Sequence, residues 1–221
     1  MIRNVLRAAL ATTCALVAAP ALATDDAFEV WFQPNFEFGL DDDTAFEIST
    51  AQRFRDLEND GRGDTYYVRG WLHQNLDSTW TVSGGAEYRE NSPGANEVRF
   101  LQQVSGKHGI LRSRVRLEQR FIDGNDGRLG LRLRTRGGVS RKISQDRRLG
   151  AKATAELFWT LRGTSVGGQT GLTGLQTQIG GDYKVSDNLT VGLVYLRDQS
   201  IRDGREDRVG HAPQLTLDFS F

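Results

Sequence analysis

Apolar and polar residues alternate with a period of two along most of the chain after residue 24, in segments of about 10 residues. The clearest segment is 111–121, where large apolar residues occupy odd positions and charged residues occupy even ones. Segment 127–138 repeats the pattern, and the residues between the two segments, 122–127, read as a hairpin loop. A period of two predicts β-strands, and helical periodicity is hard to find in this chain.

The same alternation predicts eleven strands in all. They span roughly residues 28–40, 44–55, 64–74, 79–90, 96–106, 109–122, 127–138, 149–161, 173–184, 188–198 and 212–221. Bacterial membrane barrels, however, have an even number of strands, so both chain ends lie on the same side. Pro34 is also awkward within the first segment, because proline has no backbone donor for a strand ladder. We therefore expect about 12 strands, with 10 as the alternative.

Alternation alone does not separate a soluble barrel, with its apolar face inside, from a membrane barrel, with its apolar face toward lipid. The connections favour the membrane barrel, because short turns near 41–43, 75–78, 107–108 and 185–187 contrast with longer loops near 56–63, 162–172 and 199–210. Only connection 140–148 is too long for the short-turn side. Aromatic residues also lie near strand ends, as in the girdles at bilayer interfaces. The fold predicted is an all-β, antiparallel up-and-down transmembrane β-barrel.

The final strand resembles the segment that the outer-membrane assembly machinery recognises. Its apolar face holds Leu215, Leu217, Phe219 and Phe221. At the other end of the chain, Arg3 and Arg7 precede a short apolar stretch that ends in Ala-Leu-Ala. This pattern predicts a signal peptide over residues 1–23, followed by an outer-membrane barrel over residues 24–221. The expected partners are outer-membrane lipid and the barrel-assembly machinery, and the oligomeric state stays open.

Composition narrows the chemistry. The chain carries 28 basic and 28 acidic side chains, so no bulk charge favours nucleic acid. No run of 18 apolar residues predicts a transmembrane helix. Cys14, the one cysteine, lies in the predicted signal peptide, and the three histidines are far apart in sequence. Asp41–Asp43 lacks the spacing of a calcium loop and is better interpreted as a turn. We expect no metal and no cofactor.

Rows of arginine are the most unusual feature of the chain. Residues expected to line the lumen are Arg112, Arg114, Arg116, Glu118, Arg120, Arg128, Arg132, Arg134, Arg136, Lys152 and Glu156. Like charges on neighbouring strands repel unless counterions or carboxylates lie between them. Two interpretations follow: a salt-bridge network that fills the lumen, or a basic wall that lines a water-filled path for anions. Both hold together if the lumen is only partly filled.

An enzyme is the competing class, since some outer-membrane barrels hydrolyse lipids with Ser and His on the outer wall. His211 has a suitable position and Ser200 lies upstream of it, but nothing in the sequence pairs them, and no Gly-x-Ser-x-Gly motif occurs. We therefore expect no catalytic residues.

Three stretches resemble a known family: Arg-Val-Arg-Leu-Glu-Gln-Arg-Phe (114–121), Arg-Leu-Gly-Leu-Arg-Leu-Arg (128–134) and Ala-Glu-Leu-Phe (155–158). Together with residues 178–195, they are similar to a family of bacterial proteins catalogued as domain of unknown function 2490. The resemblance implies an outer-membrane barrel and no established activity. The function expected is a structural or permeability role, as a porin-like path for small solutes or anions. The alternatives are an outer-membrane lipid-modifying enzyme and a soluble periplasmic β-barrel that binds a ligand.

Overall fold

The protein is described here by a computed structural model that covers residues 24–55, 63–124 and 127–221. The predicted signal peptide, residues 1–23, lies outside the described residues, as does nearly all of the predicted loop 56–63. The described residues contain no helix long and apolar enough to cross a membrane.

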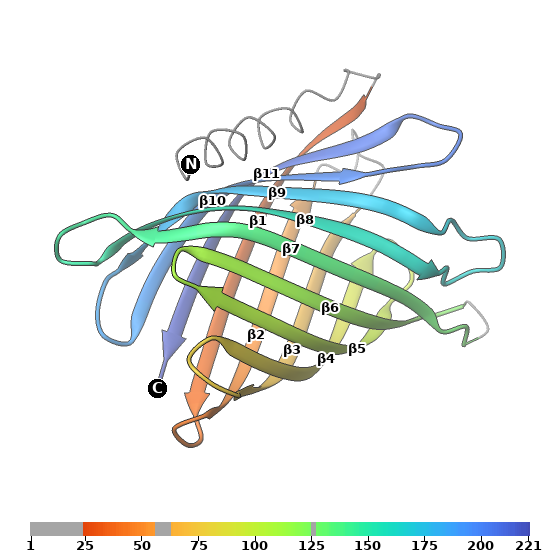
Figure 1. Cartoon of the computed structure of the whole chain (residues 1–221). Helices are drawn as coiled ribbons and strands as arrows, with labels where there is room; N and C mark the ends of the chain where they lie inside the picture. The colour runs from red at the N-terminus through yellow and green to blue at the C-terminus, as the bar shows by residue number, and fades with distance from the viewer. Residues whose placement is uncertain (1–23, 56–62, 125–126) are drawn as a thin grey trace, which may run out of the picture.

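Eleven strands close into a barrel (Figure 1). They are β1 (Thr24–Gly39), β2 (Thr44–Arg55), β3 (Asp64–Asn75), β4 (Trp80–Ser92), β5 (Glu97–His108), β6 (Leu111–Ile122), β7 (Gly130–Lys142), β8 (Leu149–Arg162), β9 (Gly171–Lys184), β10 (Leu189–Ser200) and β11 (Asp207–Ser220). Consecutive strands pair antiparallel around the barrel. The all-β prediction is confirmed, and each predicted segment corresponds to one strand.

The expectation of 12 strands, or of 10, is wrong for the described residues. The barrel closes with eleven because β1 and β11 pair in parallel. The seam is well made: the rings of Phe36 and Phe219 stack at 5.0 Å, and the backbone N–H of Phe221 donates to the carbonyl of Glu37 at 2.9 Å. Pro34 is tolerated because the ladder between β1 and β2 simply skips residues 33 and 34. The barrel therefore has no free sheet edge among the described residues, and it needs no twelfth strand to close.

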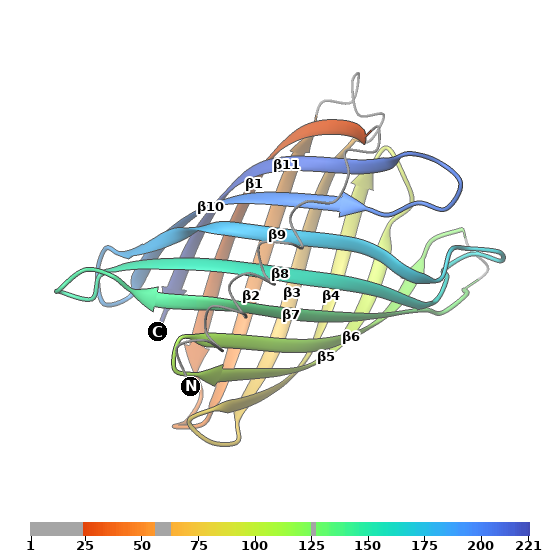
Figure 2. The same ribbon diagram turned by 45° about the horizontal axis from the view of Figure 1, so that its top comes forward.

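An odd number of strands places the two ends of the described chain at opposite ends of the barrel, contrary to the even-strand rule (Figures 1 and 2). Phe221 lies at the same end as the turns 40–43, 76–79, 109–110, 143–148 and 185–188. We call this end the turn end, and the opposite end, where β1 begins, the loop end. Asp41 closes one of these turns by accepting hydrogen bonds from the backbone N–H groups of Asp43 and Thr44 at 2.9 and 2.7 Å, and these bonds lower the pKa of its carboxyl. Asp41–Asp43 is thus part of a turn, as predicted.

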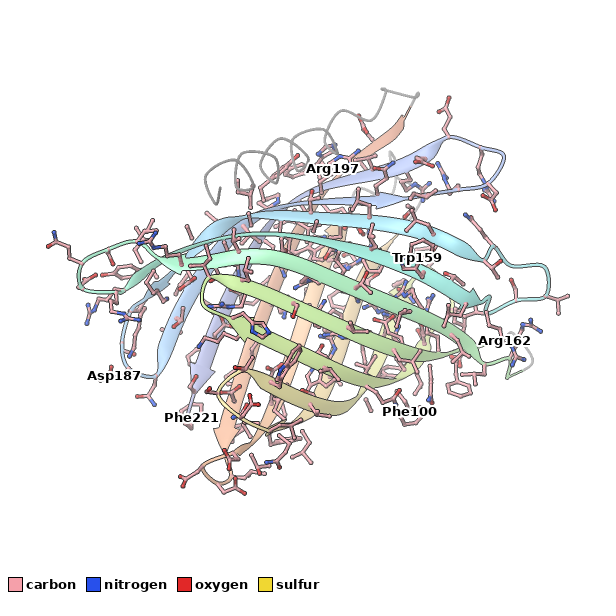
Figure 3. All side chains as sticks on the ribbon, in the orientation of Figure 1. Phe100, Trp159, Arg162, Asp187, Arg197 and Phe221 are labelled. Atoms are coloured by element: carbon pink, nitrogen blue, oxygen red, sulfur yellow. The ribbon has the colours of Figure 1, made fainter. Side chains whose placement is uncertain are left out.

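The wall of the barrel has its apolar side chains outside and its charged side chains inside. Phe100 and Trp159 point away from the wall and are 47% and 39% exposed (Figure 3). The Glu118 and Glu156 side chains, by contrast, are each only 1% exposed. A small apolar cluster of Trp31, Leu196 and Ala212 is also buried. Soluble proteins usually bury apolar side chains and expose charged ones, and this wall does the reverse, so its interior is lined by charged groups.

Because β1 and β11 pair in parallel, two cysteines introduced at facing positions of these strands should form a disulfide. In a chain with Cys14 replaced by Ala, Phe36→Cys with Phe219→Cys should cross-link under mild oxidation, because paired strands lie about 4.8 Å apart, within disulfide range. Non-reducing gels and mass spectrometry of the refolded protein report the bond. The matched pair Phe36→Cys with Leu193→Cys should stay reduced, because Leu193 lies on β10, which pairs with β9 and β11 but not with β1. Equal cross-linking of both pairs, or of neither, would contradict this topology.

Candidate functional site

Buried glutamates each hold several arginines inside the barrel. Glu156 on β8 accepts from Arg114 at 2.5 Å, Arg134 at 2.9 Å and Arg136 at 2.6 Å. The register explains the set, because Glu156 pairs with Arg136 of β7, which in turn pairs with Arg114 of β6. One carboxylate therefore separates cations that would otherwise repel across neighbouring strands.

The same arrangement continues around the wall. Arg134 also contacts Glu118 at 2.9 Å, and Arg132 contacts Glu118 at 2.5 Å. Arg99 contacts Glu118 at 3.9 Å and extends the network to two further carboxylates on β4 and β5. These are Glu87, which also binds Arg69 and Arg89, and Glu97, which also binds Arg120. A continuous ion-pair network thus joins β3 through β8.

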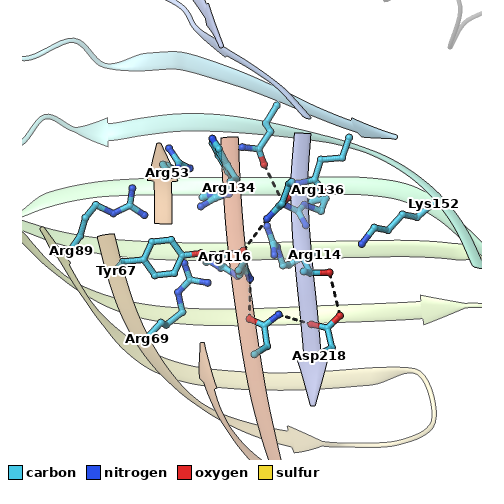
Figure 4. Close-up of a pocket in the computed structure, with 17 residues that line it drawn as sticks. Arg53, Tyr67, Arg69, Arg89, Arg114, Arg116, Arg134, Arg136, Lys152 and Asp218 are labelled. Carbon is cyan, nitrogen blue, oxygen red and sulfur yellow. Dashed lines mark hydrogen bonds between the residues drawn. The ribbon is translucent and has the colours of Figure 1, made fainter. Parts of the chain in front are cut away.

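Within this network lies a cavity of about 240 Å³ (Figure 4). Its cationic lining consists of Arg53, Arg69, Arg89, Arg114, Arg116, Arg134, Arg136 and Lys152. Its remaining lining consists of Trp31, Gln33, Asn35, Tyr67, Gln176, Gln178, Gln214, Thr216 and Asp218. Eight cations and one carboxylate therefore face the same space.

Three of the lining cations have no carboxylate in contact among the described residues. The Arg53 guanidinium stacks over the Trp31 ring at 3.5 Å, and its Nε has no hydrogen-bond partner. Arg116 donates only to the neutral side chain of Gln103, at 2.9 and 2.6 Å, and lies over the Trp71 ring. Lys152 makes no hydrogen bond or ion pair with any part of the chain that the structure describes. The interior is consequently richer in positive than in negative charge.

A second cavity, of about 130 Å³, shares Arg53, Arg89, Arg134 and Gln176 with the first. It is also lined by Ser200, the last residue of β10. The four shared side chains therefore lie between the two spaces. Three of these four are arginines, so the region between the two cavities is lined by guanidinium groups.

Sequence reasoning placed eleven residues on the lumen, and the structure gathers most of them. Arg114, Arg116, Arg134, Arg136 and Lys152 line the larger cavity, while Glu118, Arg120, Arg132 and Glu156 belong to the ion-pair network. Arg112 and Arg128 stay apart. Arg112 donates to the carbonyls of Gly109 and Leu111 in its own turn, and Arg128 donates to the carbonyl of Gly163.

Four further arginines of the interior were missed: Arg53, Arg69, Arg89 and Arg99. A signal for them existed. Each lies at an odd position of a predicted strand whose even positions are apolar, so the alternation assigns it to the polar face.

The structure does not bring His211 and Ser200 together, although His73 lies between the Ser83 hydroxyl and Glu47, whose Oε2 is 3.6 Å from the His73 Nε2 atom. The His211 Nδ1 atom bonds the Tyr195 hydroxyl at 2.5 Å, whereas Ser200 lines the smaller interior cavity. The ligand atoms of His73, Glu37 and Glu47 lie within 4.8 Å of one another, which makes them the three described residues that come closest to a metal-binding set. His73 already bonds the Ser83 hydroxyl through Nδ1 at 2.8 Å.

Removing one shared carboxylate should weaken the barrel strongly. Glu156→Gln keeps the shape of the side chain but leaves Arg114 and Arg136 without a counter-charge and Arg134 with Glu118 alone, and breaking a buried ion pair costs about 3–5 kcal/mol. Urea unfolding of the refolded protein in detergent measures the loss. Glu206→Gln, on an exposed loop residue, is the control and should be neutral. Equal stability of the two variants would refute the role given to Glu156.

Comparisons with known proteins give a family but no activity. No curated protein matches the chain. A solved structure described as "Unveiling the Mechanism Behind the in-meso Crystallization of Membrane Proteins" is similar at 14% identity and a TM-score of 0.42, over 83% of this chain and 78% of the other. That similarity is too low to support an argument. The model of the family described as "Protein of unknown function (DUF2490)" matches residues 28–209. The chain therefore belongs to this family, as its resemblance predicted.

Proposed function

We propose that the protein is an integral β-barrel of the bacterial outer membrane whose arginine-lined interior forms a narrow passage that favours small anions. The observation that carries the proposal is the inverted wall, apolar outside and charged inside. In water, a belt of exposed Phe, Leu, Val and Ile side chains would drive aggregation. In a bilayer, the same belt meets hydrocarbon, while the ionic groups keep to an enclosed interior.

The placement of exposed aromatic residues supports a bilayer-spanning wall. One group lies near the turn end and comprises Phe38, Phe46, Trp80, Tyr183 and Phe221. A second group lies near the loop end and comprises Phe28, Phe54, Tyr66, Tyr88, Phe100 and Trp159. Two such girdles, separated by aliphatic side chains, are typical of the two interfaces of a membrane barrel.

The preference for anions follows from the charge of the interior. Arg53 and Lys152 lack a carboxylate partner among the described residues, so their charge acts on mobile ions in the lumen. The guanidinium layer shared by the two cavities narrows the path. We therefore expect a small conductance, unlike that of a wide general porin.

Planar bilayers test this proposal. The refolded chain from residue 24 onward should insert and give small conductance steps, with a reversal potential in a KCl gradient that indicates preference for chloride. Lys152→Glu should shift the reversal potential toward potassium, because it replaces an unpaired cation on the cavity wall with an anion. Arg205→Glu, a change of equal charge on an exposed loop residue, should shift it much less. A silent protein, or one that prefers cations, would refute the passage.

A further inference from the structure

We propose that the larger interior cavity is a binding site for a small multivalent oxyanion of the phosphate type, held by Arg53, Arg116 and Lys152. The inference deepens the proposed function, since it assigns a ligand class to the same interior. It requires a water-accessible cavity and does not require ions to pass through the barrel.

Charge balance is the first argument. Eight cations line the cavity, whereas the carboxylates that line it or contact those cations are four: Glu87, Glu118, Glu156 and Asp218. Glu87 and Glu118 are shared further, because both also contact Arg99, which is not part of this wall. A cavity whose walls carry such an excess of positive charge attracts mobile anions.

Free donors are the second argument. The Arg53 side chain makes no hydrogen bond or ion pair within the described chain, so only the face of its guanidinium group, stacked on Trp31, is occupied. Arg116 is 5% exposed and has only a neutral acceptor in Gln103. Buried guanidinium groups with unused N–H edges are suited to oxyanions, whose paired oxygens match the fork of the donor.

Geometry favours one side of the cavity. The three cations come from β2, β6 and β8, so they surround the space instead of lying along a single strand (Figure 4). Asp218 is the one carboxylate among the lining residues, and it accepts a hydrogen bond from Asn35 at 2.5 Å. It repels an anion from its own part of the wall, so Arg53 and Arg116 should make the closest contacts with the ligand, and Lys152 should contribute mainly through its charge. Polar residues such as Gln33 and Gln214 surround the remaining space.

A multivalent ion fits this environment better than a halide does. Chloride neutralises one positive charge and offers no second atom for a bidentate contact. A cavity of about 240 Å³ has room for an ion larger than chloride. Phosphate and pyrophosphate carry several charges and several acceptor oxygens, so each can contact cations from more than one strand at once.

Isothermal titration of the refolded protein in detergent, with pyrophosphate as the probe and chloride at equal ionic strength as the reference, tests the site. Pyrophosphate should bind saturably at one site per barrel. Arg53→Gln should weaken the affinity about tenfold or more, because a hydrogen bond to a charged group is lost. Lys152→Gln, a milder change in case Arg53→Gln fails to fold, should also weaken it. Inorganic phosphate should compete, but more weakly.

The matched control is Arg205→Gln, which removes one cation from an exposed loop residue and should leave the affinity unchanged. Absence of saturable heat would overturn the proposal, and so would binding that both interior variants leave intact. If the proposed passage is wrong and the binding site is right, the two experiments give different results. A barrel that binds pyrophosphate but is silent in bilayers keeps this site and loses only the conducting role, whereas one that conducts without binding loses the site.

Discussion

The shared carboxylate is the interaction on which the interior of this barrel depends. Arginines occupy facing positions on adjacent strands, as at Arg114 and Arg136, and would repel one another across the ladder. Glu156 binds both, and Glu118 of β6 binds Arg132 and Arg134, two arginines on the same face of β7. The charged face of the wall can therefore point inward, and the apolar face then lies on the outside of the barrel.

That arrangement links the fold to the chemistry proposed for it. Glu87, Glu118 and Glu156 each contact three arginines, so the described residues that line the larger cavity carry more positive than negative charge. The cations left over, Arg53, Arg116 and Lys152, are the described residues that face the cavity without a carboxylate in contact. The same shortage of carboxylates thus underlies both the proposed passage for anions and the proposed binding site.

Much of the fold could be predicted because a period of two leaves only two faces for each strand. The rows in segments 111–121 and 127–138 identified their charged face directly from the sequence. The alternation itself predicted eleven segments, and the even-strand rule of membrane barrels changed that expectation to 12 or 10. The parallel pairing of β1 with β11, which lets eleven strands close, is not visible in any local pattern. Arg53 and Arg89 are on the polar faces of their strands, as the alternation indicates, but they come from β2 and β4, and only closure of the barrel brings them to the same cavity as the arginines of β6 and β7.

Orientation of the wall is the central claim, and the four tryptophans test it most directly. Trp31 and Trp71 are buried at 6% and 3% exposure, whereas Trp80 and Trp159 are 40% and 39% exposed on the outer face. Variants that retain a single tryptophan, with Phe at the other three positions, can be refolded into vesicles whose lipids carry bromine on the acyl chains. The account predicts strong fluorescence quenching of Trp80 and Trp159 and little quenching of Trp31 and Trp71. Equal quenching of all four, or the reverse order, would contradict it.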